Sequence, residues 1–467
     1  MDIEVIKTGE GDLQKFVTDI ISAKKKVFDA EVYKQFLGKN HKINNLIDRP
    51  NKNARVPIGD GSKDENGELK LMTKPVKIAR ISTEFQKLIT TTATSFGAGG
   101  GVILKAKATT EQKPMLNKAK DVWKRAKCDF KNYDILEAIY SQKQVAEIWY
   151  TNSNKELRCN VYKPSEGYEL IPIFDGNRDL QVFGLKYIVE IDGKDVERLD
   201  IYTDTTLTRL QKNEKWELTE PIIKLVYGKM PVVYYQYDEV IFEGVQSLIE
   251  RYEVLLSNFA DTNDYNGSPI LFAKGEINGF AEHGETGKVI EAEGDADLKY
   301  ISNNAVPESV KLEFETIKNL IYTLTLTPEL SFDIMVNLGN VSGLAMDRIL
   351  TGAHLKAKKI QNGVYGIGIQ RRLNFLVSAL SNIDSDLKVG KDLYITPDFK
   401  LFRIGDEGEN IRNLMLANGN MPIIDWEKSI EEGGFSEDPE QTMKTIEEKL
   451  KEVALSGNNA NNAPQGQ

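Results

Sequence analysis

The stretch from residue 238 to residue 383 constrains the fold of this chain more than any other part of the sequence. Residues 239–264 place apolar side chains at steps of four and three, which predicts an amphipathic helix of roughly 38 Å. Pro307 begins a second helical pattern, since proline is well tolerated at the first helical position. The residues between the two patterns are rich in glycine and in strand-forming residues. We therefore expect the chain to leave one helix, form a compact insert with strands, and return in a second helix.

A loop and a long helix follow the second helical pattern. Pro328 ends that pattern, and residues 339–343 (GNVSG) indicate an irregular loop. Ser342 is a suitable N-cap for a helix predicted over residues 342–383. Three glycines lie in the middle of this helix, at Gly363, Gly366 and Gly368. Because each costs about 1 kcal/mol in a helix relative to alanine, we expect a kink or a close packing contact there.

Patterns elsewhere predict further helices and a β-rich region. The expected helices are residues 12–37, 78–96, 113–127, 132–144, 407–416, 425–431 and 439–455. From Val145 the apolar period changes to two, which predicts strands over residues 145–151, 157–163, 168–174, 181–191, 196–203, 205–211 and 231–237. Further strands are expected over residues 269–274, 287–293, 298–301 and 392–403. Residues 51–70 are polar and glycine-rich and are interpreted as a flexible loop.

This order of elements resembles the portal protein of tailed bacteriophages, of the siphophage type. The sharpest local match is residues 339–345, GNVSGLA. Residues 228–258, GKMPVVYYQYDEVIFEGVQSLIERYEVLLSN, resemble the passage of that family from its last wing strand into its stem. The resemblance covers roughly residues 12–430. It implies an α+β portal fold, with an α/β wing, a two-helix stem, a small clip insert containing strands, a long kinked helix and a helical crown.

The resemblance also implies a division of the chain into the parts of that fold. The expected parts are a wing (1–237, β-rich from about 145), a first stem helix (238–264), a clip (265–306), a second stem helix (307–326), a tunnel loop (327–341), a long helix with a return to the wing (342–405) and a crown (406–455). Residues 456–467 are rich in glycine, asparagine and glutamine and are expected to be disordered.

Charge and composition limit the function. The net charge of −10 argues against a protein whose whole surface binds nucleic acid. It does not argue against a channel through which DNA slides, because an acidic lumen repels phosphates. No apolar run is long enough for a membrane span, and the first residues lack a secretory signal. Cys128 and Cys159 are isolated; a disulfide between them stays open, although a reduced state is the simpler interpretation.

No residue pattern predicts catalysis. The serine of GNVSG stands one place too late for a G-x-S-x-G nucleophile elbow. The glycine run of residues 97–101 follows a helix and does not complete a nucleotide-binding fingerprint. The three histidines, His41, His283 and His354, have no zinc-site spacing with the two cysteines. We therefore expect no enzyme activity, no metal and no cofactor.

The resemblance implies roles for individual residues in a ring of about twelve copies. The first stem helix would turn three acidic residues toward the lumen: Glu243, Glu250 and Asp261. The tunnel loop would contact DNA through Phe332, Met335, Val336, Asn337 and Leu338. Basic residues of the long helix would contact either a neighbouring subunit, which we favour, or DNA: Lys356, Lys358, Lys359, Arg371 and Arg372.

The implied function is that of a portal in the virion, at the capsid vertex through which the genome is packaged, retained and ejected. The implied partners are further copies of the chain, double-stranded DNA, a terminase motor, head-completion and tail adaptor proteins, and the major capsid and scaffold proteins, with no membrane. Assembly would take place in the cytoplasm of a bacterial host. Two alternatives stay open, a different ring or adaptor protein of the virion and an unrecognised metal-dependent enzyme.

Overall fold

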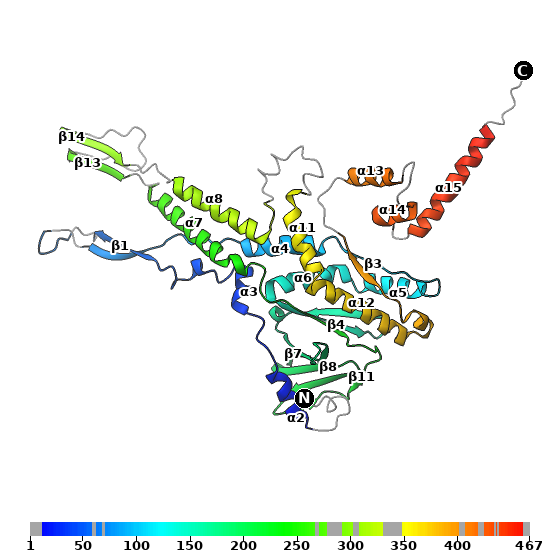
Figure 1. Ribbon diagram of the computed structural model, residues 1–467. Helices are drawn as coiled ribbons and strands as arrows, with labels where there is room; N and C mark the ends of the chain where they lie inside the picture. The colour runs from blue at the N-terminus through cyan, green and yellow to red at the C-terminus, as the bar shows by residue number, and fades with distance from the viewer. Residues whose placement is uncertain are drawn as a thin grey trace, which may run out of the picture. The chain divides into compact units, whose positions relative to one another are not determined.

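The computed structural model describes residues 12–57, 62–67, 71–266, 270–277, 292–301, 308–329, 348–400, 407–418, 425–433, 436 and 439–460. The chain divides into two units. The first unit comprises Met1–Glu329 and Gly352–Phe402, and the second comprises Leu330–Thr351 and Arg403–Gln467. The fold mixes helices and sheets, as expected from the sequence (Figure 1). Every strand pair in the described residues is antiparallel.

Two sheets form the β-rich part of the first unit. The smaller has the strand order β12-β4-β5, and the larger has the order β10-β9-β8-β7-β6, with β11 paired to β9. The strands of the smaller sheet are β4 (Gln144–Thr151), β5 (Leu157–Tyr162) and β12 (Val232–Gln236). Those of the larger are β6 (Glu169–Phe174), β7 (Leu180–Ile191), β8 (Lys194–Tyr202), β9 (Thr206–Lys212), β10 (Trp216–Leu218) and β11 (Ile223–Lys224). The seven strands predicted between residues 145 and 237 are therefore present; β10 and β11 were not expected.

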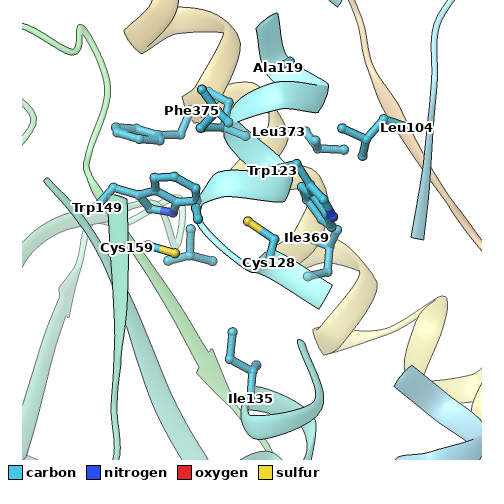
Figure 2. Close-up of a cluster of buried hydrophobic side chains, with 14 of the residues drawn as sticks. Leu104, Ala119, Trp123, Cys128, Ile135, Trp149, Cys159, Ile369, Leu373 and Phe375 are labelled. Atoms are coloured by element: carbon cyan, nitrogen blue, oxygen red, sulfur yellow. The ribbon is translucent and has the colours of Figure 1, made fainter. Parts of the chain in front are cut away.

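The main core lies between the smaller sheet and three helices, α5 (Lys113–Arg125), α6 (Cys128–Gln142) and α12 (Val364–Ile383). Figure 2 shows Trp149 of β4 and Phe375 of α12 in this core, with their ring centroids 5.8 Å apart. Cys128 and Cys159 are also buried here, and both are free thiols in the structure. Long-range packing thus joins residues 113–162 to residues 364–383.

The N-terminal region differs from the sequence prediction in three places. The helix expected over residues 12–37 is two helices, α2 (Leu13–Ser22) and α3 (Ala30–Phe36), and α2 packs on the larger sheet. The region expected to be a loop, residues 51–70, contains β1 (Lys52–Pro57), which forms a hairpin with β2 (Leu71–Val76) directly after that region. The helix expected from residue 78 begins later, as α4 (Phe85–Ala98). Three 3₁₀ turns complete the region before residue 246: η1 (Lys42–Asn44), η2 (Pro164–Glu166) and η3 (Glu243–Val245).

The helix–insert–helix order predicted from residue 239 onward is present. After η3, the helix α7 (Gln246–Asn266) leads to the strands β13 (Ile270–Ile277) and β14 (Ala292–Ile301), and the chain returns in α8 (Glu308–Thr325). The two strands pair as a hairpin. The first helix begins later than expected, because the 3₁₀ turn precedes it.

The predicted interruption of the long helix is also present. Helix α11 (Thr351–Gln361) ends before Gly363, and α12 begins directly after it. A side chain at Gly366 would place its Cβ 1.7 Å from the carbonyl oxygen of Gln361, so the break depends on glycine there. The turn η4 (Ser385–Gly390) follows α12, and β15 (Thr396–Phe399) then pairs with β3 (Val102–Lys105), within the region where a strand was expected.

Three helices after residue 403 belong to the described part of the second unit. They are α13 (Glu407–Ala417), α14 (Trp426–Gly433) and α15 (Pro439–Ala460). Their positions agree with those predicted from the sequence, except that α15 continues through residues 456–460, where a disordered tail was expected to begin. A mainly apolar pocket lies among them, with Met415, Trp426 and Ile446 in its lining.

Candidate functional site

Helices α7 and α8 pack through the apolar stripe that the sequence predicted. Ile249 of α7 and Ile321 of α8 are fully buried in a shared cluster. Aromatic side chains extend the contact, since the ring of Phe314 lies 5.4 Å from that of Tyr252 and 6.2 Å from that of Phe259, centroid to centroid. The two helices therefore form one rigid pair that carries the β13–β14 hairpin at its end.

The opposite, polar face of α7 is covered by the protein's own N-terminal region. Two segments, residues 40–50, which include the 3₁₀ turn η1, and residues 77–84, lie along it, and we call them the N-terminal strap. Backbone N–H groups of the strap donate to side chains of α7: Ala79 to Asp261 (2.7 Å), Ile81 to Ser257 (2.9 Å) and Thr83 to Glu253 (2.8 Å). These hydrogen bonds explain why residues 78–84 are not helical.

Charged contacts reinforce the strap. Arg49 donates to Asp261 at 3.0 Å, and the Asp261 side chain is only 14% exposed. Lys42 pairs with Glu250 at 2.9 Å. Asp261 and Glu250, two of the residues predicted to line a lumen, thus have their carboxylates engaged inside the protomer, and their place at a lumen stays a prediction. Glu243, in η3, is exposed, so it stays available for such a role.

His41 and Glu253 form a buried pair at the centre of the strap. Their side chains are each 1% exposed, and His41 Nδ1 lies 2.6 Å from Glu253 Oε1. The other ring nitrogen, Nε2, lies 3.1 Å from the carbonyl oxygen of Gln35. Both nitrogens face acceptors, and only the protonated imidazole can donate from both. The hydrogen bond to Glu253 accordingly raises the pKa of His41 above its usual value.

The raised pKa of His41 predicts a pH-dependent stability. A group whose pKa is higher in the folded state stabilises the fold fully below its unfolded value, here about 6.5, and the contribution disappears as the pH rises through the folded pKa. Replacing His41 with glutamine should lower the free energy of unfolding by about 1 to 3 kcal/mol at pH 6. The difference in the free energy of unfolding between wild type and the glutamine variant should become smaller toward pH 9. Denaturant unfolding across this range measures it; a difference that stays constant with pH would contradict a charged His41.

The basic residues of the long helix fall into three different environments. Lys358, Lys359 and Arg371 are exposed. Lys356 reaches the end of α8, where its ammonium group donates to the carbonyl oxygen of Thr325 at 2.6 Å. Burial, with the charge of Lys359, lowers the pKa of Lys356 to about 8. A cation at a helix C-terminus is stabilised by the helix dipole, so this contact joins α11 to α8.

Arg372 lies in the main core, which is incompatible with the predicted contact to a neighbouring subunit or to DNA. Its side chain and that of Glu147 are each 0% exposed, and the two are 2.6 Å apart. Arg372 also donates to Asn132 at 2.6 Å, and its guanidinium lies 5.0 Å from the ring centroid of Trp123. The hydroxyl of Tyr235 donates to the same carboxylate oxygen of Glu147 at 3.3 Å. The pair joins α12 to β4 and α6.

Sequence reasoning missed His41, Glu253 and Glu147 as important residues. Glu147 had a signal, because the alternation of its strand places it on the same face as Val145 and Trp149, where a charge is unexpected. A charge at an inward position calls for a buried partner. The strap had no comparable signal, since its contacts join residues about 200 positions apart in the sequence.

The predicted tunnel-loop residues Phe332, Met335, Val336, Asn337 and Leu338 lie outside the described residues. Within the described part of the chain, no group of three or more potential ligand side chains could hold a metal ion. Likewise, none of the helices in that part has the length and apolarity needed to cross a membrane.

Comparison with known proteins gives three similarities. The sequence model of the family described as "Phage portal protein, SPP1 Gp6-like" matches residues 30–454. A curated relative, "Portal protein" of Bacillus phage SPP1, is 23% identical over 344 residues, which cover 67% of this chain and 66% of that relative. The match thus spans just under two thirds of the relative's length. A solved structure titled "Neck of native GTA particle computed with C12 symmetry" contains a similar chain, with a TM-score of 0.40, 11% identity, and coverage of 75% of this chain and 91% of that one.

Proposed function

The chain belongs to the SPP1 Gp6-like phage portal protein family, and from this membership we propose that it forms the ring-shaped channel at one vertex of a phage capsid. The role is structural rather than catalytic. The genome enters through the channel during packaging, is retained behind it and leaves through it on ejection. The observation that carries this proposal is the family match over residues 30–454. The order of helix α7, the β13–β14 hairpin and helix α8 is consistent with the portal proposal.

The parts of a portal are assigned in the same way. We propose α7 and α8 as the stem, and the β13–β14 hairpin as the clip, which would contact the terminase motor and later the tail adaptors. The two sheets with α5 and α6 would form the wing. The helices α13, α14 and α15 would form the crown. That these helices belong to a unit distinct from the wing, which also includes Leu330–Thr351, supports the last assignment.

The strap changes which surfaces are available to the ring. Lumen charges on the stem would come from Glu243 rather than from Asp261, whose carboxylate is already paired with Arg49. The exposed cations Lys358, Lys359 and Arg371 remain candidates for contacts to a neighbouring copy or to DNA. Lys356 is assigned instead to the join between the stem and the long helix.

The mass of the purified protein in solution tests the ring. Light scattering should give a particle of about 0.6 MDa, about twelve times the 52.5 kDa chain, and low-resolution images should show a central hole. Because scaffold proteins assist some assemblies, the measurement is repeated with the cognate scaffold. A compact monomer under all of these conditions would contradict the proposal.

The proposed tunnel loop predicts a defect in DNA handling without a defect in assembly. Replacing Phe332 and Met335 with alanine should leave the ring intact but lower packaged DNA at least about tenfold, because apolar groups can touch a duplex without forming phosphate salt bridges. Packaging in an in vitro or phage complementation assay measures the effect. The matched control replaces exposed Phe130 with alanine. Wild-type packaging by the double variant would refute the loop assignment.

A further inference from the structure

The strands of the β1–β2 hairpin pair only with each other among the strands that the structure describes. All six residues of β2 are exposed, including Leu71, Met72 and Val76. An isolated two-stranded ribbon is at best marginally stable in water. A further surface is therefore needed to cover its apolar side chains.

The base of the hairpin is nevertheless fixed. Directly before β1, Arg49 is bound to Asp261 of α7, and Lys52 in β1 lies 3.6 Å from the same carboxylate. Arg80, shortly after β2, donates to the carbonyl oxygen of Arg49 at 2.8 Å and to Asn51 at 2.9 Å. These contacts hold both ends of the hairpin on the polar face of α7, and Figure 1 shows β1 extending away from the helices. The hairpin is thus aimed outward from a rigid base.

Helix α8 has an exposed apolar surface with acidic residues nearby, which suits the apolar and basic hairpin. Its inner face buries Ile317 and Ile321 against α7. On its outer face a row of leucines is exposed: Leu312 (65%), Leu320 (40%) and Leu324 (61%). The exposed carboxylates Glu308 and Glu315 lie on the same helix. The hairpin strands contain three cationic residues and no acidic one: Lys52, Arg55 and Lys74. Lys52 is bound to Asp261 at the base, so the charge that complements these carboxylates comes from the rest of the hairpin.

The two surfaces lie on opposite sides of one helix pair. The strap and the base of the hairpin occupy the α7 face that carries Glu253 and Asp261, whereas α8 packs on the α7 face that carries Tyr252 and Phe259. One protomer therefore presents the hairpin on one side and the leucine row on the other. Such an arrangement suits a head-to-tail contact between copies, which closes into a ring when the rotation allows it.

We propose that the β1–β2 hairpin of one copy lies along the exposed leucine row of α8 in the next copy. This inference rests on the proposed ring and names the contact that joins its neighbours. Met72 and Val76, which share one face of the hairpin with Lys74, cover the leucines, and Lys74 approaches Glu308 and Glu315. The occupant of the leucine row is a second copy of this chain.

Cross-linking between two single-cysteine variants tests the contact. Met72→Cys and Leu320→Cys are prepared separately with tags of different mass, mixed under assembly conditions and treated with a short bismaleimide. The native cysteines are 0% and 1% exposed, so they do not compete in the folded protein. We expect a covalent heterodimer at least about ten times more abundant than the one formed by Met72→Cys with Ile188→Cys, whose cysteine replaces an exposed residue of β7.

The outcomes separate this inference from the proposed function. Rings that form normally without a heterodimer above the Ile188 control would overturn the hairpin contact and leave the portal proposal intact. Failure of the wild-type chain to form rings under any condition would overturn both. As a second test, Met72→Glu should raise the concentration needed for assembly at least about tenfold with an unchanged Tm, whereas Ile188→Glu should not. Unchanged assembly of Met72→Glu would count against the contact.

Discussion

Replacing Glu147 with glutamine is expected to lower the free energy of unfolding by about 3 to 5 kcal/mol. The substitution preserves the shape of the side chain but removes the only charge that is paired with Arg372 in the core. The guanidinium would then remain fully buried without a counter-charge, and its cation–π contact with Trp123 could not replace the carboxylate. Equilibrium unfolding in urea, followed through the tryptophan fluorescence of this core, measures the loss.

Two further variants show whether the loss comes from the unpaired charge. In the double variant Glu147→Leu with Arg372→Met, no charge is left unpaired. Its loss of unfolding free energy should therefore be well below the sum of the losses caused by the two single substitutions. The exposed pair of Arg251 and Glu313 is the matched control. Arg251→Gln should cost less than about 1 kcal/mol, as surface ion pairs do. A loss for Glu147→Gln no larger than this would show that the buried pair does not contribute as proposed.

Replacing Gly368 with alanine is expected to lower the free energy of unfolding by about 2 to 3 kcal/mol, despite the higher helix propensity of alanine. The added Cβ would lie 1.9 Å from Cε1 of Tyr235, whose ring is fully buried. That ring cannot move aside easily, because its hydroxyl is hydrogen-bonded to Glu147. The clash therefore forces α12 away from β12. Urea unfolding at constant pH measures the change.

Gly352 in α11 provides the control for the same substitution. A Cβ there would lie 3.5 Å from the nearest atom, Cδ2 of Leu326, which is an ordinary contact distance. Gly352→Ala should therefore leave the stability within about 1 kcal/mol of wild type or raise it, since alanine favours the helix. Equal losses for the two variants would show that the close approach of Gly368 to Tyr235 is not the cause.

The sequence predicted most elements because their patterns are local. Strands β4 to β9 follow an alternation of period two, and α7 and α8 follow apolar stripes of helical period. The cost of Gly363, Gly366 and Gly368 in a helix predicted a kink or a close packing contact, and the structure has a break beside Gly363. The missed elements depend on distant residues. Residues 78–84 have a helical pattern, yet their backbone N–H groups bond to Ser257, Glu253 and Asp261 of α7, and this tertiary contact outweighs local preference.

The functional residues were harder to place for the same reason. Arg371 and Arg372 look alike in the sequence, but neighbours on a helix point about 100° apart, so that one reaches solvent and the other the core. From the resemblance, acidic residues at the polar positions of the first stem helix were expected to line a lumen. A polar stripe is equally compatible with a covering segment that supplies hydrogen-bond donors, and the sequence pattern cannot distinguish the two.

The bond from Lys356 to the carbonyl oxygen of Thr325 bears on how the chain can tolerate insertions. It joins the end of α8 to α11, on either side of residues 330–347. The two ends of that segment are therefore held together by contacts that do not depend on its length. Closing a loop between fixed ends becomes costlier by only about 0.6 kcal/mol for each doubling of its length. An insertion between residues 330 and 347 should therefore leave the contact between α8 and α11 in place.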